Sequence, residues 1–121
     1  MDDIRQQQLD ALKMVADYSD RLIPAMTDVI AELKGEQQDD TLAFLAQIID
    51  ALNFVIETFN VTRDLVNEKE IVIDEDDLES TVNRLSDAMI SKNYEKAAQV
   101  MDERVLPFLK TYNASARTLT A

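Results

Sequence analysis

Four segments of the sequence carry apolar residues at helical spacing, and no segment shows the alternation of a β-strand. The segments run from about Asp3 to Lys34, from Thr41 to Val66, from Glu75 to Ser91 and from Tyr94 to Asn113. Short polar connections separate them, and helices joined in this way lie antiparallel to each other. The sequence therefore predicts an all-α fold, a single antiparallel four-helix up-down bundle.

Both prolines lie inside predicted helices, Pro24 in the first and Pro107 in the last. Proline removes a backbone hydrogen bond and clashes with the preceding turn, so we expect both helices to be proline-kinked. The first segment forms either one kinked helix or two collinear helices that meet near Leu22. Each proline ends a similar stretch, DRLIP at Asp20–Pro24 and ERVLP at Glu103–Pro107. The two bends either wrap the helices around a core or open a groove between them.

The ends of the helices carry recognisable signals. Gly35 follows the first segment, where a left-handed C-cap residue is expected. Asp39 or Asp40 is a natural N-cap for the second helix. The acidic run Asp74–Asp77 precedes the third apolar segment, where carboxylates cap the helix and complement its dipole. An EF-hand calcium loop that began at Asp74 would require glycine and glutamate at its sixth and twelfth positions, and neither is present.

Length and charge limit the classes of partner. A chain of 121 residues fits one domain. We expect residues 1–113 to form it and residues 114–121 to form a frayed C-terminal tail. Acidic residues outnumber basic ones 24 to 12, a net charge of −12. Nucleic acids and anionic lipids are bound mainly through Lys and Arg clusters. The expected partner is therefore another protein or a second copy of the chain, and not nucleic acid or a membrane.

The most apolar stretch, Leu42 to Phe59, contains Asp50 and Glu57. On this basis we interpret it as a buried helix that is too short and too charged for a membrane span. The first residues lack the basic and apolar regions of a secretory signal. These two observations predict a cytoplasmic protein.

Catalysis has little support in the composition. The chain has no histidine, no cysteine and one glycine. Histidine is the side chain that titrates near neutral pH, and cysteine is the usual soft nucleophile and metal ligand. Glycine-rich phosphate loops and the Glu-x-x-His pairs of di-iron bundles are also excluded. We therefore predict no enzyme activity, no cofactor and no metal site.

The second helix is apolar over most of its circumference. Besides its main apolar face it carries a second strip, which consists of Phe54, Val61 and Leu65. A four-helix core need not have room for this strip, and if it is exposed it marks an interface. We therefore predict Phe54, Val61 and Leu65 as partner-binding residues. Asn53, Asn60 and Asn67 recur every seven residues and form either a solvated flank or a polar marker within an interface.

The segment Asn93–Ala98 (NYEKAA), followed by Val105–Leu109 (VLPFL), resembles the last helix of small acidic bundle proteins of flagellated Gram-positive bacteria. In general shape the chain is also similar to the flagellar export chaperone family, which includes the flagellin chaperones. This resemblance implies a helical bundle that holds a helix of a client protein, and it implies no site residue.

Together these features predict a non-enzymatic protein-binding module, such as an export or assembly chaperone that holds a partner helix. Two alternatives remain open. The strip on the second helix could form a homodimer in a structural or self-assembling protein. The acidic segment Asn67–Glu79 could instead belong to a small regulatory protein that captures a basic partner.

Overall fold

The computed structural model describes residues 2–121, and this part of the chain is all-helical, without a strand. The predicted all-α class is confirmed. In chain order the elements are α1 (Asp2–Lys34), α2 (Thr41–Val66), α3 (Glu75–Ile90), α4 (Tyr94–Val100), the π-helix η1 (Met101–Val105) and α5 (Leu106–Leu119).

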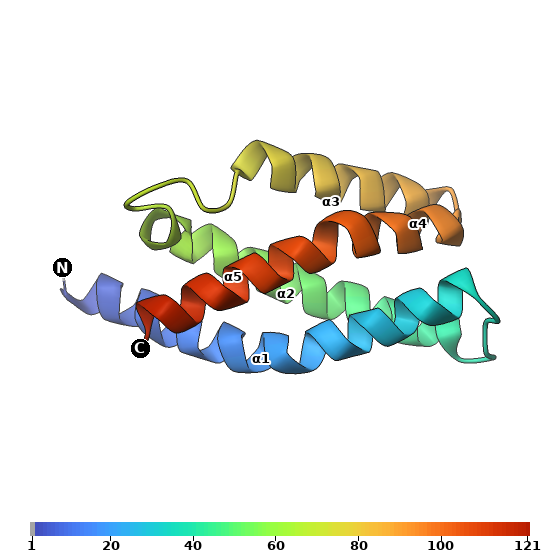
Figure 1. The fold of residues 1–121 in the computed structure, drawn as a ribbon, viewed down its shortest axis with the longest axis horizontal. Helices are drawn as coiled ribbons and strands as arrows, with labels where there is room; N and C mark the ends of the chain where they lie inside the picture. Colours follow the sequence, from blue (N-terminus) through green and yellow to red (C-terminus); the bar gives the residue numbers. More distant parts are fainter. Residues whose placement is uncertain (1) are drawn as a thin grey trace.

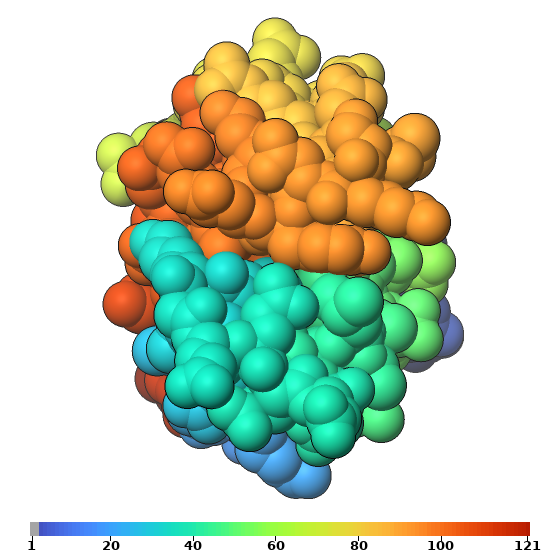
Figure 2. Space-filling model, turned by 90° about the vertical axis from the view of Figure 1, so that its right-hand side faces the viewer, coloured from blue at the N-terminus to red at the C-terminus, as the bar shows by residue number. Residues whose placement is uncertain are grey.

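The helices lie side by side along the long axis of the molecule (Figure 1). α1 and α2 pack against each other along their length, and α5 packs against both of them. α3 lies at the opposite edge from α1, and its closest backbone contacts are with α4 and η1. At one end of the molecule the connection between α1 and α2 lies next to α4 (Figure 2). Lys34 Nζ and Asp102 Oδ2, 2.8 Å apart, join α1 to η1 at this end.

The core contains apolar side chains from every helix, because each helix turns one apolar face inward. Its largest fully buried side chains include Tyr112, Phe59, Leu12, Met26, Leu45 and Leu109. One polar contact crosses this core, between Tyr112 Oη and Thr62 Oγ1 at 2.6 Å. Thr62 Oγ1 also lies 2.8 Å from the carbonyl oxygen of Thr58, to which it can donate within its own helix. The buried hydroxyls of Thr62 and Tyr112 therefore have hydrogen-bond partners.

α2 contributes ten buried residues to the structure. By length and composition alone it could cross a membrane, which corrects the prediction that the stretch is too short and too charged. The core helix of a soluble protein meets the same criteria. Here the buried face of α2 packs on α1 and α5.

Two of the predicted helix ends differ in detail from the structure. Gly35 does not adopt a left-handed conformation; the residue with a positive φ, 55°, is Lys92, in the turn between α3 and α4. Asp40 occupies the N-cap position of α2 but makes no capping hydrogen bond with its side chain. Next to it, the buried hydroxyl of Thr41 joins the preceding loop to α1. It accepts from Gln38 N at 2.7 Å and donates to Glu32 of α1 at 2.8 Å.

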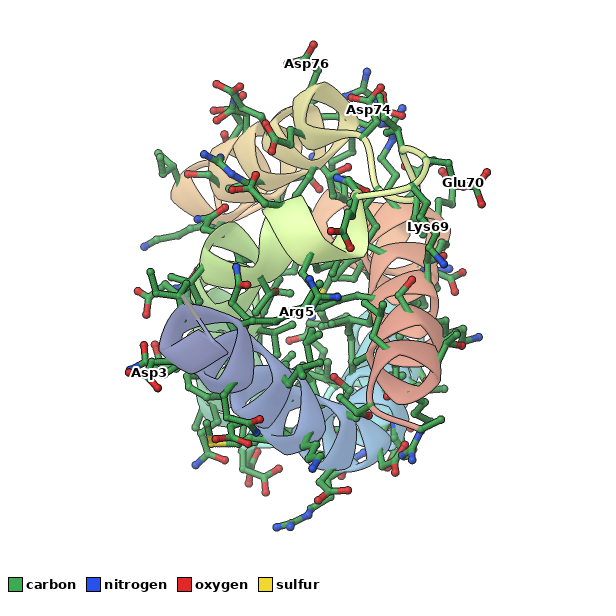
Figure 3. All side chains as sticks on the ribbon, turned by 90° about the vertical axis from the view of Figure 1, so that its left-hand side faces the viewer. Asp3, Arg5, Lys69, Glu70, Asp74 and Asp76 are labelled. Atoms are coloured by element: carbon green, nitrogen blue, oxygen red, sulfur yellow. The ribbon has the colours of Figure 1, made fainter. Side chains whose placement is uncertain are left out.

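The start of α3 agrees with the sequence. The carboxylate of Asp74 accepts hydrogen bonds from the backbone N–H groups of Asp76 and Asp77, at 2.8 and 3.2 Å. Three further acids occupy the first turn of the helix. In Figure 3, Asp74 and Glu70 lie on the loop before α3, and Asp76 projects outward from the first turn. This acidic run therefore serves as a helix cap, the role that its position predicts.

The prolines lie in different surroundings. Pro24 lies within α1, which continues from Asp2 to Lys34 as one helix and not as two. Pro107 lies in the first turn of α5, directly after η1. A π-helical turn shifts the backbone hydrogen-bond pattern by one residue and accommodates the missing donor of a nearby proline. α5 then continues to Leu119, beyond the expected helix end at Asn113.

Candidate functional site

Residues in the N-terminal half of α3 line three adjoining cavities. The largest, about 270 Å³, lies between α2 and α3, and we call it the α2–α3 groove. A second, about 170 Å³, lies between α3, the preceding loop and α5. A small apolar gap of about 10 Å³ lies between them. Leu78 lines all three cavities, so the side chain that anchors the first turns of α3 has incomplete contacts on several sides.

The floor of the α2–α3 groove is apolar and comes from both helices: Ile56, Phe59, Leu78 and Val82. Phe59 belongs to an aromatic cluster. Its ring packs edge-to-face on the rings of Phe108 and Tyr112, with distances between ring centroids of 5.8 and 5.4 Å. Such edge-to-face contacts favour a fixed arrangement of the rings. The α2 wall of the groove is thus backed by packed aromatic rings of α5.

The rim of the α2–α3 groove is polar, with Asn60, Arg63, Glu75 and Glu79. Arg63 Nε and Glu75 Oε1 lie 3.3 Å apart and bridge α2 to α3 across one end of the groove. Both side chains are about half exposed, so this ion pair contributes only about 0–1 kcal/mol to holding α3 in place. Glu79 has no ion-pair partner among residues 2–121.

The second cavity touches the π-helix. Arg104, in η1, lines it together with Asp74 and Asp77 at the start of α3. Apolar side chains, among them Val72 and Pro107, complete the wall. π-Helical turns occur frequently at functional sites, where they change the direction of side chains. The cavity and η1 together mark this side of α3 as irregular in packing and in backbone.

The three predicted partner-binding residues do not form one exposed strip. Phe54 is half-buried, and its ring contacts Tyr18 of α1 edge-on at 5.1 Å. Val61 is 63% exposed. Leu65 is only 4% exposed and faces a cavity that Leu119 of α5 also lines. Leu65 therefore does not meet the condition of exposure under which the strip would mark an interface, and the last turn of α5 extends beside it. Whether Phe54 and Val61 contact a partner stays a prediction.

The asparagine strip divides in a similar way. Asn67 has a structural role: its side chain accepts from Val72 N and Ile73 N and donates to Ile73 O, at 2.9, 3.1 and 3.0 Å. These bonds fix the loop that leads to α3. Asn60 lines the α2–α3 groove and Asn53 is exposed. Only Asn60 therefore belongs to the candidate site.

Neither the possible metal ligands nor the residues with shifted pKa values indicate a second functional site among the described residues. Among the described residues no group of three or more acidic, histidine or cysteine side chains is placed to hold a metal ion. Burial raises the pKa of Tyr112 to about 12, against a smaller opposing effect of its hydrogen bond to Thr62. Hydrogen bonds from Arg117 and Asn113 hold the pKa of Asp20 below its ordinary value. Both groups tie helices together, and neither faces the cavities beneath α3.

Fold and site together define an all-helical protein with an open groove between α2 and α3 that has an apolar floor and a polar rim. Residues 10–115 match the family described as "Domain of unknown function (DUF8042)", so the chain belongs to this family. No curated protein and no solved structure matches the chain.

Proposed function

We propose that the protein is a non-enzymatic binding module that holds an amphipathic helix of a partner protein in the α2–α3 groove. One observation supports this proposal: Leu78 of α3 lines three cavities, so the first turns of α3 pack incompletely against the apolar floor that α2 provides. Apolar grooves between helices are a common docking place for amphipathic helices. An export or assembly chaperone, which holds a client helix until delivery, is the role that fits this behaviour best.

The size of the groove supports a side-chain ligand. A cavity of about 150 Å³ in a protein core can bind benzene. The α2–α3 groove, about 270 Å³, therefore has room for one or two apolar side chains of a docking helix. A whole helix needs more width than this, so docking requires that α3 move away from α2.

The packing of α3 permits this movement. α3 buries four residues, and only Leu78 and Leu85 among them are large. α5, which is two residues shorter, buries Phe108, Leu109 and Tyr112. Because stabilisation follows the apolar area removed from water, α3 is held less tightly than α5. In this proposal α3 swings on the turn at Lys92 and on the loop that Asn67 organises.

A cross-link tests the movement directly, because the chain contains no cysteine of its own. Ile56→Cys on α2 and Val82→Cys on α3, both half-buried at the groove, are joined by a short dithiol-reactive linker. The probe is a synthetic amphipathic helix as long as α3, 16 residues, with leucines at i, i+3, i+4 and i+7. Its binding is followed by fluorescence anisotropy.

We expect the unlinked double variant to bind the peptide and the linked protein to lose at least about tenfold in affinity, which corresponds to about 1.4 kcal/mol. The matched control links Lys34→Cys to Asp102→Cys, which join α1 to η1 away from the groove, and it should bind like the wild type. Equal binding by both linked proteins would refute a role for the α2–α3 groove.

A homodimer is the second candidate, and one observation favours it. Met14 on α1 and Val61 on α2 are 55% and 63% exposed on two helices that pack together. The half-buried pair Tyr18 and Phe54 joins the same two helices. If these residues form the interface, sedimentation should show twice the 13.7 kDa mass of the chain, and Met14→Ser with Val61→Ser should restore the monomer. A wild-type protein that stays monomeric at all concentrations would exclude it.

A further inference from the structure

We infer that the helix held in the α2–α3 groove carries lysine or arginine residues on both sides of its apolar face. This inference rests on the proposed function and adds the chemistry of the partner. Helices α2 and α3 together contain eight acidic residues and two arginines, so they account for half of the net charge of −12. The segment from α4 to α5 contains three acidic and four basic residues. Both helices that border the groove are therefore acidic, whereas the segment from α4 to α5 is not.

One unpaired carboxylate lies on the rim of the groove, and a second lies on α2 one helical turn beyond it. Glu79 lies on the α3 rim. Asp64 is exposed on α2, next to the groove-lining Arg63 and one helical turn from Asn60. Neither carboxylate has an ion-pair partner among residues 2–121. Arg63 is paired with Glu75, so the basic residue of this rim is already neutralised. A docking helix therefore meets the unpaired carboxylate of Glu79 at the α3 rim, and that of Asp64 where it extends past Asn60 on α2.

The same charges argue against the other occupants of the groove. A second copy of this chain would bring another net charge of −12 to an already acidic surface. An acidic helix would place like charges opposite Asp64 and Glu79, and such contacts oppose association. A helix with an apolar face and basic flanks can pack its apolar side chains on the floor and pair its basic side chains with the carboxylates of the rim.

The test uses three synthetic helices with the same leucine positions and with lysine, glutamine or glutamate on the flanks. We expect the lysine peptide to bind at least about tenfold more tightly than the glutamate peptide, with glutamine between them. Its affinity should fall as salt rises from about 0.1 M to about 1 M, because the Debye length falls from about 10 to about 3 Å.

Two variants locate the charge effect. Asp64→Asn with Glu79→Gln should lower the affinity for the lysine peptide by about tenfold, a loss typical of two exposed ion pairs. Asp10→Asn with Asp17→Asn, exposed on the outer face of α1, changes the net charge equally and should leave affinity within about twofold.

Each other outcome has a definite meaning. If all three peptides bind equally and the cross-linked groove excludes them, the proposed function stands and the basic partner is overturned. If no peptide binds, the proposed function itself fails. If Asp64→Asn with Glu79→Gln causes the protein to dimerise, the groove accepts a second copy and the basic partner is again overturned.

Discussion

Replacing Leu78 by alanine tests the loose packing of α3, on which the proposed function depends. Leu78 is 9% exposed and lines all three cavities, so its side chain lacks neighbouring atoms on several sides. Leucine-to-alanine changes in cores cost about 2–5 kcal/mol, and the cost rises with the volume of the cavity that the change creates. Because part of the space around Leu78 is already empty, we expect Leu78→Ala to lower the free energy of unfolding by about 2 kcal/mol.

Leu109→Ala on α5 is the matched control, because Leu109 is fully buried. The change should lower the free energy of unfolding by about 4 kcal/mol, towards the upper end of the range for buried leucines. Both values come from urea unfolding followed by circular dichroism. Native-state hydrogen exchange adds a local measurement: backbone amides of α3 should exchange with a lower opening free energy than those of α2 and α5.

An equal loss of stability in Leu78→Ala and Leu109→Ala would contradict this reasoning. It would mean that α3 is seated as firmly as α5, and a partner helix could then not displace it. Uniform protection of α3 and α5 against exchange would lead to the same conclusion.

Two further predictions concern titration. Tyr112 loses its proton near pH 12 when folded and near its ordinary value of about 10 when unfolded, so stability falls between these pH values by about 2–3 kcal/mol. Tyr112→Phe should remove this fall when urea unfolding is measured across that range, and an unchanged fall would show that another group causes it. The lowered pKa of Asp20, held by Arg117 and Asn113, gives stability that is present above its ordinary pKa and lost as pH falls. Asp20→Asn should flatten this acid dependence, whereas Asp28→Asn, also exposed on α1, should retain it.

The helix limits could be predicted because apolar periodicity is a local property. α2 begins at Thr41 and ends at Val66, as its pattern predicts, and the carboxylate of Asp74 caps α3. The capping details that differ from the prediction depend on tertiary contacts. Asp40 makes no capping bond, and beside it the hydroxyl of Thr41 instead binds Glu32 of α1. No pattern within one helix contains that information.

The candidate site is only partly visible in the sequence for the same reason. Leu65 lies on an apolar strip that looks unpartnered, yet α5 continues to Leu119 and lies beside it. The small polar residues after Asn113 give no sign of this contact, although Ala116 is fully buried. The spacing of the asparagines makes Asn60 a candidate interface marker, and it does line the groove. The groove itself depends on the distance between α2 and α3, which no single segment determines.

The composition of α3 connects these observations. A 16-residue helix that buries two leucines gains little from packing, and isolated helices of this length are marginal in water. The cap at Asp74 and the acids of the first turn supply part of the missing stability locally, through hydrogen bonds and the helix dipole. We therefore expect α3 to stay helical if its contacts with α2 are exchanged for those of another helix, as the proposed function requires. In the proposed function the acidic run keeps the displaced helix folded, while the unpaired carboxylate of Glu79 on the rim of the groove favours a basic partner.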